Sequence, residues 1–219
     1  MNKLFRLDSP FMIKLSKFSD MVILSILWVV CCIPVFTIGP ATAAMYHVTL
    51  KMARKEDEGV IGCFFQGFKM NFKQGVVLNL IFLVLGAVLV LDYFYWGGIG
   101  GTAAMICSVI FLVLFIWMLC IMFYTYALQA QFYNPIRRTL KNAMVLATQK
   151  FGDTLVIFLL NMIPVIVGFV SYKIFLSAIP IWVLVAPAGI AYLCSRRFVA
   201  IFAPYLEPEE AETEEIETE

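Results

Sequence analysis

The sequence has 219 residues, of which 62% are hydrophobic and 14% are charged. Soluble domains average about 45–50% apolar and about 25% charged residues, so this composition excludes a soluble globular domain. A chain with this much apolar surface needs an apolar solvent, and the lipid bilayer is that solvent. We therefore predict an all-α fold: a polytopic transmembrane bundle with five or six membrane-embedded helices plus short amphipathic interfacial helices.

The net charge of +1 conceals two parts of opposite charge. Eight of the 15 acidic residues lie in 207–219, so residues 1–206 contain all 16 basic residues and only 7 acidic ones. The basic part is expected to face anionic lipid headgroups. Residues 1–206 are predicted to form a single membrane domain. Residues 207–219 are predicted to form a disordered acidic tail, because like charges repel and no apolar face is present; docking of this tail on a basic partner is the alternative.

The first 55 residues are predicted to form three segments. Residues 1–20 alternate apolar and basic side chains and are expected to lie in the membrane interface. Residues 21–39 are predicted to form the first span, with a kink at Pro34, because an apolar stretch of about 20 residues crosses the bilayer core. Residues 40–55 are predicted to form a helix whose apolar part is too short to cross the bilayer alone.

The middle of the chain combines an interfacial helix with two spans. Apolar residues at helical spacing predict an aromatic helix over 60–73, partly sunk in the headgroup region. Two spans are predicted at 74–95 and 102–127, joined by the glycine-rich turn at 96–101. The apolar stripe of the interfacial helix consists of Ile61, Phe64, Phe65, Phe68 and Phe72, and Lys69 and Lys73 lie beside it.

A second amphipathic helix is predicted over 136–148, because Asn134-Pro135 is typical of a helix start. Two further spans are predicted at 154–172, with a break at Pro164, and at 178–195. The apolar stripe of the amphipathic helix consists of Ile136, Leu140, Ala143, Met144 and Ala147, with Arg137 and Lys141 beside it.

The distribution of lysine and arginine predicts the orientation, because these residues are enriched on the cytoplasmic side. Residues 51–73 contain five of them and residues 137–150 contain four, so both segments are predicted to be cytoplasmic. The basic amino terminus is also predicted to be cytoplasmic, which requires an even number of passes. Six embedded elements satisfy this requirement if the chain turns at Pro34–Gly39 and the next helix leads it back; five spans are the alternative.

The sequence contains no catalytic or metal-binding signature. The glycines at 96–101 are not followed by the lysine of an ATPase phosphate loop, and they fit a turn between spans. The single histidine, His47, has no neighbouring ligands, and no pair of the six cysteines forms a CxxC motif. We therefore predict a protein that is not an enzyme and has no cofactor, no metal and no nucleic-acid partner.

Three polar residues in the predicted spans are candidates for function, because polar groups are costly in hydrocarbon unless they find partners. Asp92 lies beside Tyr93 and Tyr95, so a water-facing carboxylate at the interface is expected; an ion or proton site is the alternative. Asn79 and Asn161 are expected to bridge helices through amide hydrogen bonds, and contact with a substrate is the alternative.

Three stretches carry a resemblance to a known family: PVFTIGPATAAMYHVTLKMAR at 34–54, CFFQGFKMNFKQG at 63–75 and RTLKNAMVLA at 138–147. Together they resemble the YesL-like family of bacterial integral membrane proteins, a domain of unknown function, over most of the chain. The most specific positions are Thr37, Gly39, Pro40 and Ala41, followed by Gly67, Phe68, Lys69, Asn71, Phe72, Lys73 and Gln74.

The resemblance implies an accessory role in carbohydrate transport. Members look like small multi-span companions encoded near carbohydrate ABC importers and two-component sugar sensors in Gram-positive bacteria. It therefore implies a protein of the bacterial plasma membrane that contacts the lipid bilayer and binds ABC importer subunits or a membrane sensor kinase. The candidate docking residues are the family motif and a second basic group, namely Arg137, Arg138 and Lys141.

Two other functions remain open from the sequence. One is an independent small transporter or channel in which Asn79, Asp92 and Asn161 face a common cavity. The other is a scaffold that senses the bilayer through its aromatic interfacial helices. The oligomeric state and the ligand do not follow from these residues.

Overall fold

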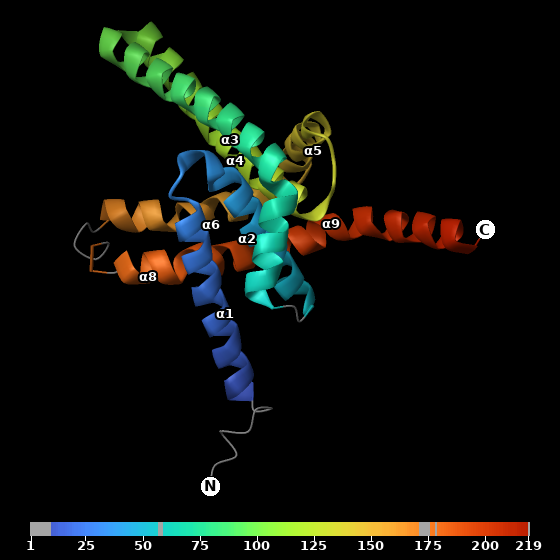
Figure 1. The fold of residues 1–219 in the computed structure, drawn as a ribbon. Helices are drawn as coiled ribbons and strands as arrows, with labels where there is room; N and C mark the ends of the chain where they lie inside the picture. The colour runs from blue at the N-terminus through green and yellow to red at the C-terminus, as the bar shows by residue number, and fades with distance from the viewer. Residues whose placement is uncertain (1–9, 57–58, 171–175, 178, 219) are drawn as a thin grey trace.

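The computed structural model describes residues 10–56, 59–170, 176–177 and 179–218, and side chains between Leu15 and Leu206 within these ranges. Every regular element in these ranges is helical, which confirms the predicted all-α class. In chain order the elements are α1 (Pro10–Cys31), η2 (Val35–Thr37), α2 (Ile38–Arg54), α3 (Val60–Ile99), α4 (Thr102–Gln131), α5 (Ile136–Gln149), α6 (Phe151–Val170), α8 (Ile179–Leu184) and α9 (Ala186–Thr218) (Figure 1).

α2 is the central helix of the fold. It packs against α3, α4 and α9, and it also contacts α1 and η2. Three of its four alanines, at 41, 43 and 44, are fully buried, and such small side chains let neighbouring helices approach closely. The helix predicted at 40–55 is thus observed, and protein encloses it on several sides, as its short apolar length requires.

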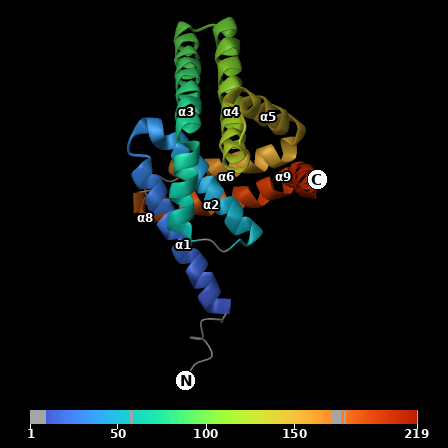
Figure 2. The ribbon, with the colours of Figure 1, turned by 45° about the vertical axis from the view of Figure 1, so that its right-hand side comes forward.

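Two arms extend from this centre (Figure 1, Figure 2). α3 and α4 pack along each other as a long antiparallel hairpin, and α6 forms a second arm that packs against α9. The hairpin turns at Gly100 and Gly101, whose φ angles of 76° and 90° favour glycine. The predicted turn at 96–101 is therefore confirmed at its last two residues, because α3 continues to Ile99.

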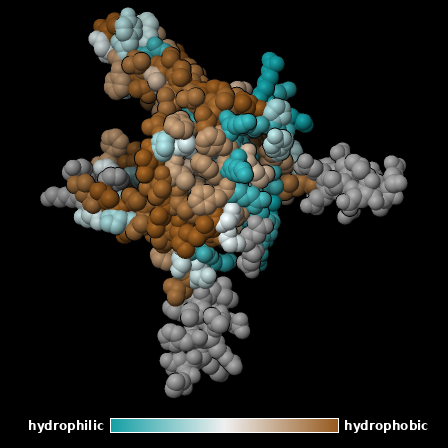
Figure 3. Space-filling model, viewed as in Figure 1, coloured by the Kyte–Doolittle hydropathy of each residue, from teal (hydrophilic) through white to brown (hydrophobic). Residues whose placement is uncertain are grey.

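Three helices are long and apolar enough to cross a bilayer, namely α3, α4 and α6. Large apolar side chains such as Leu91, Ile106 and Phe169 are exposed on them, and Figure 3 shows apolar residues over both arms. This pattern indicates an integral membrane protein. The predicted five or six embedded helices stay a prediction, because α1 carries charges in its first half and α2 and α8 are short.

Two pairs of segments that we predicted to be separate are continuous helices. The interfacial segment and the first span share α1, whose residues before Pro10 lie outside the described part of the chain. The aromatic segment at 60–73 and the span at 74–95 are one 40-residue helix, α3. No proline interrupts either junction, and a helix that packs on protein at one end and lipid at the other has no reason to break. The predicted aromatic stripe is also divided, because Phe64 is buried whereas Ile61 and Phe65 are exposed.

The chain reverses between α1 and α2, where the sequence predicts a turn at Pro34–Gly39. Thr37 closes this turn, because its hydroxyl oxygen lies 2.6 Å from the carbonyl oxygens of both Cys31 and Pro34. Cys31 ends α1, where carbonyls have no helical partner, whereas the Pro34 carbonyl also accepts a hydrogen bond from the Thr37 backbone N–H at 3.0 Å. The turn is thus part of the fold and not a kink within a single span.

An aromatic cluster attaches α9 to the centre of the fold. The ring of Phe198 packs 5.7 Å from Tyr46 of α2 and 5.2 Å from Tyr124 of α4, in edge-to-face contacts. Phe198 also stacks on Phe202 at 5.5 Å. The last predicted span, 178–195, is observed as α8 and the first part of α9. α9 continues to Thr218, and the predicted disorder of the acidic tail at 207–219 stays a prediction, because its side chains lie outside the described ones.

A buried hydroxyl pair provides a test of this packing. Thr49 of α2 and Ser195 of α9 are fully buried, and their side-chain oxygens lie 2.8 Å apart. We expect Thr49→Val to lower the free energy of unfolding by about 1–3 kcal/mol, because it leaves the Ser195 hydroxyl without this partner. Thermal unfolding in detergent measures the effect. The double variant T49V/S195A is expected to recover part of the loss, and a wild-type melting temperature for T49V would contradict the assigned contact.

Candidate functional site

Glycines allow α2 and α3 to approach each other closely at the family motif. A Cβ atom on Gly39 would overlap the carbonyl oxygen of Gly75, and one on Gly75 would lie 2.8 Å from the Cα atom of Pro40. Neither contact is possible without moving the backbone. Gly39 and Pro40, two of the predicted site residues, therefore set the distance between α2 and α3.

A second close contact lies further along the same two helices. A Cβ atom on Gly67 would lie 3.0 Å from the His47 side chain, so the imidazole packs directly on the α3 backbone. The Nδ1 atom of His47 lies 3.1 Å from the carbonyl oxygen of Ala130 in α4. A carbonyl oxygen only accepts hydrogen bonds, so Nδ1 must donate. His47 thus connects α2, α3 and α4 by packing and by one hydrogen bond.

Amide side chains continue this connection to the end of α4. Asn71 donates to the Gly67 carbonyl oxygen at 3.0 Å, and Gln129 donates to the Asn71 carbonyl oxygen at 3.2 Å. Arg54 of α2 donates to the Gln131 side chain at 2.5 Å. Two buried acceptor or donor atoms, His47 Nε2 and Gln129 Oε1, have no partner among the described residues. The cluster therefore fixes the end of α4 to α2 and α3. The chain continues from this end of α4 into α5.

Asn79 connects the turn after α1 to α4. Its amide nitrogen donates to the Val35 carbonyl oxygen at 2.9 Å, and its amide oxygen accepts a hydrogen bond from the Tyr126 hydroxyl at 3.3 Å. The side chain is 7% exposed. Asn79 and Thr37 together hold the reversed chain against the hairpin. The buried amide of Asn79 therefore has a hydrogen-bond partner in the protein for its nitrogen and another for its oxygen.

The remaining motif residues on α3 face outward. Lys69 and Lys73 are exposed, and Met70 between them is 57% exposed. Phe68 is half-buried, and its ring centroid lies 5.5 Å from that of Phe72. The two rings therefore pack against each other along α3. The predicted motif therefore has two parts: packing residues against α2, and an exposed basic part that makes no ion pair within the described chain.

α5 presents a second exposed basic surface. Its buried face packs on the end of α4 through Thr139, Ala143, Leu146 and Ala147. Arg137, Arg138 and Lys141 are exposed. Met144, which we placed on the apolar stripe, is 53% exposed, so that position is corrected: the buried stripe passes through Leu146 instead. Figure 3 shows hydrophilic residues gathered around α5 and around the turn between α2 and α3.

The structure does not bring the three candidate intramembrane polar residues together. Asn79 lies at the centre of the fold, and Asp92 lies 13 residues further along α3, about 20 Å away at 1.5 Å per residue. Asn161 of α6 donates to the Ile157 carbonyl oxygen at 2.8 Å and approaches the Cys194 sulfur of α9 at 3.5 Å. Each residue therefore has its own surroundings in the fold.

The described residues contain no group of three or more His, Cys, Asp or Glu side chains that could hold a metal ion.

Other connecting residues were not apparent from the sequence. Thr154 of α6 donates to the Tyr124 hydroxyl at 3.0 Å, and Arg197 of α9 donates to Asp153 at 3.2 Å. Their partners are 30 and 44 residues away in the chain, so no local spacing indicates them. The Gly67 and Gly75 pair on α3 is a signal that was available but was interpreted only as part of the motif.

These features define the class: an α-helical integral membrane protein whose central helix packs on glycines. Residues 21–93, one third of the chain, match a family model described as a protein of unknown function, DUF624. The matched part comprises the second half of α1, all of η2 and α2, and most of α3, and so contains both sides of the Gly39–Gly75 contact. No curated protein and no solved structure matches the chain.

The glycine contact generates a prediction with opposite signs at two positions of α3. Gly75→Ala is expected to lower the free energy of unfolding by about 1–3 kcal/mol, because the new methyl group would meet the α2 backbone. Gly62→Ala is the matched control: nothing lies within 4 Å of its Cβ position, so only the gain in helix propensity remains. Melting temperatures in detergent should fall for G75A and stay equal or rise for G62A. Equal behaviour of the two variants would contradict the close packing.

Proposed function

We propose that this protein is a non-enzymatic, YesL-like accessory protein of the bacterial plasma membrane that binds a carbohydrate ABC importer or a membrane sensor kinase. One observation carries the proposal: the described chain has two exposed basic surfaces, one formed by Lys69 and Lys73 on α3 and one formed by Arg137, Arg138 and Lys141 on α5. Both surfaces are attached to the rigid polar cluster at the end of α4.

The charges on these surfaces favour a protein partner with acidic groups. None of the five cations makes an ion pair within the described chain. Exposed methionine and aromatic side chains accompany them, with Met70 57% and Met144 53% exposed. Basic residues that surround apolar ones are typical of a docking surface, because charge orients the partner and apolar contact adds affinity.

The orientation expected from lysine and arginine supports the same proposal. Segments rich in these residues stay on the cytoplasmic side, which would place both surfaces, and both termini, in the cytoplasm. The ATPase subunits of importers and the catalytic domains of sensor kinases are also cytoplasmic. A partner's membrane helices would contact the exposed apolar arms at the same time.

The alternative of an independent transporter receives no support from the polar residues in the spans. Asn79 and Asn161 are engaged in hydrogen bonds within the fold. Asp92 lies far along the hairpin from both. A transport site usually assembles several such groups around one cavity near the midplane.

Charge reversal at the α3 surface tests the proposal. The tagged protein is solubilised gently from its native membrane, and co-purifying importer subunits and kinases are quantified by mass spectrometry against an unrelated membrane bait. We expect K69E/K73E to lower partner recovery about tenfold, because like charges would then face an acidic surface. The matched control K69R/K73R keeps the charge and should retain the partner. Equal partner recovery with both variants, at equal membrane levels of the protein, would contradict docking at α3.

The α5 surface is tested separately. R137E/R138E/K141E changes three exposed residues opposite the buried face of α5, so the fold should be retained. We expect partner recovery to fall while the melting temperature in detergent stays within a few degrees of wild type. If the wild-type protein purifies without any importer subunit or sensor kinase, that result would contradict the accessory function as a whole.

A further inference from the structure

The turn between α1 and α2 presents apolar side chains to its surroundings. Ile33 is 76% exposed, Val35 is 57% exposed and Phe36 is 50% exposed. No Asp, Glu, Lys or Arg lies between Asp20 and Lys51, so the whole reversal of the chain carries no such charge. Turns that face water are usually polar, and a contiguous apolar surface of this kind is typical of contact with a membrane or another protein.

Side chains provide hydrogen-bond partners for the backbone of the same turn. The carbonyl oxygens of Cys31 and Pro34 each lie 2.6 Å from the Thr37 hydroxyl, and the carbonyl oxygen of Val35 accepts from the Asn79 amide at 2.9 Å. Water would supply such partners at a solvated surface, whereas in hydrocarbon the protein itself must supply them. These hydrogen bonds are therefore the ones that a turn surrounded by acyl chains requires.

The contacts of the turn with α3 give its depth in a bilayer. Lys73 and Asp92 bound an uncharged part of α3, and their separation of 19 residues corresponds to about 28 Å, close to the roughly 30 Å of a hydrocarbon layer. The turn meets α3 at Asn79, about 9 Å along the helix from Lys73 and about 20 Å from Asp92. The turn therefore lies in the leaflet at the Lys73 end of α3.

α2 leads the chain from this turn back out of the leaflet. Gly39 packs on Gly75 and His47 packs on Gly67, so α2 and α3 run antiparallel with matching intervals of eight residues. α2 therefore passes the level of Lys73 and continues towards the start of α3. The polar cluster at the end of α4 contacts this same part of α2 and α3, which is consistent with a position outside the hydrocarbon.

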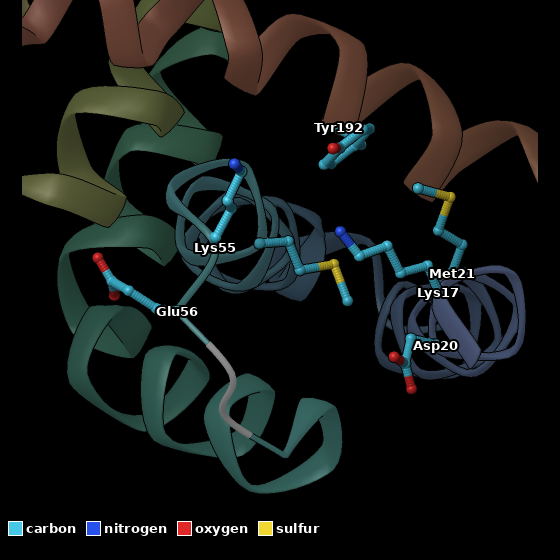
Figure 4. Close-up of a pocket in the computed structure, with 7 residues that line it drawn as sticks. Lys17, Asp20, Met21, Lys55, Glu56 and Tyr192 are labelled. Atoms are coloured by element: carbon cyan, nitrogen blue, oxygen red, sulfur yellow. The ribbon is translucent and has the colours of Figure 1, made fainter. Parts of the chain in front are cut away.

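The charged ends of α1 and α2 lie together, at the opposite end of the pair from the turn. Lys17 and Asp20 of α1 line one pocket with Lys55 and Glu56, which follow α2 (Figure 4). From Asp20 to its last residue, Cys31, α1 rises about 16 Å, which is too short to cross roughly 30 Å of hydrocarbon. Both helices therefore enter and leave the bilayer on one side.

We infer that the turn from Ile33 to Thr37 inserts into the acyl chains of a single leaflet, at the Lys73 end of α3. α1 and α2 thus form a re-entrant hairpin that contributes no crossing, in place of the two passes that six embedded elements assign to this part of the chain. The apolar surface of the turn continues that of the α3–α4 hairpin and anchors the polar centre of the fold at the membrane surface. The inference does not depend on the proposed partner.

Maleimide labelling of single cysteines in right-side-out and inverted membrane vesicles tests the inference. The full chain, with its six native cysteines replaced by alanine, receives one new cysteine at a time. We expect Lys17→Cys and the 89% exposed position of Tyr133→Cys to react with an impermeant maleimide from one side. Gly98→Cys, at the far end of the α3–α4 hairpin, should react from the other side. Val35→Cys should react from neither side, and should react fully once detergent removes the lipid.

Each other labelling pattern overturns the inference. Reaction of Val35→Cys from the Gly98 side, or of Lys17→Cys from that side, would show that α1 crosses the bilayer. Reaction of Val35→Cys from the Tyr133 side would place the turn in water. Protection of Val35→Cys that persists in detergent would show that protein, and not lipid, covers the turn.

A second measurement keeps the native cysteines, in case the cysteine-free chain melts at a lower temperature than wild type. Phe36→benzoylphenylalanine places a photoreactive side chain in the turn of the otherwise unchanged protein. Irradiation in native membranes should yield phospholipid adducts at this position, detected as a mass increase of the corresponding peptide. Tyr133→benzoylphenylalanine is the matched control and should yield none. Absence of lipid adducts at Phe36, or equal adducts at both positions, would contradict insertion of the turn.

Discussion

The direct contact of α2 with α3 is the constraint on which the rest of the structure depends. Where Gly39 and Pro40 meet Gly75, no side chain separates the two backbones. Each helix also carries the hydrogen-bonding residues that attach the other elements: Asn79 holds the turn after α1, and His47 reaches α4. A wider spacing between α2 and α3 would separate these donors from their acceptors, so the glycines determine the polar contacts as well as the packing.

The fold combines a dense centre with arms that require lipid. Around α2, the Thr49 and Ser195 hydroxyls and the Asn79 amide are hydrogen-bonded and aromatic rings are packed, as in the core of a soluble protein. The outer parts of α3, α4 and α6 instead expose aliphatic side chains to their surroundings. Helices in a bilayer gain little from burying such side chains against each other, because lipid is equally apolar. The arms can therefore diverge, while the polar contacts keep the centre together.

The candidate site follows from this division. On the outer surfaces of α3 and α5 the chain exposes lysine and arginine beside methionine and aromatic residues. The motif that appeared as one sequence feature serves two purposes, since Gly39, Pro40 and Gly67 pack inside and Lys69 and Lys73 face outward.

The sequence by itself determined the helical class, the membrane environment, the hairpin turn at Gly100 and Gly101 and the reversal after Pro34, because composition and local backbone preference act within a few residues. The tertiary structure decided that 60–73 and 74–95 form one helix, that Met144 faces outward, and that Asn79, Asp92 and Asn161 lie apart. It also decided which distant side chains meet, as Thr49 and Ser195 do across 146 residues. Helical periodicity defines faces but not the neighbour that each face meets; that choice depends on the close approach of whole helices, which the glycines permit.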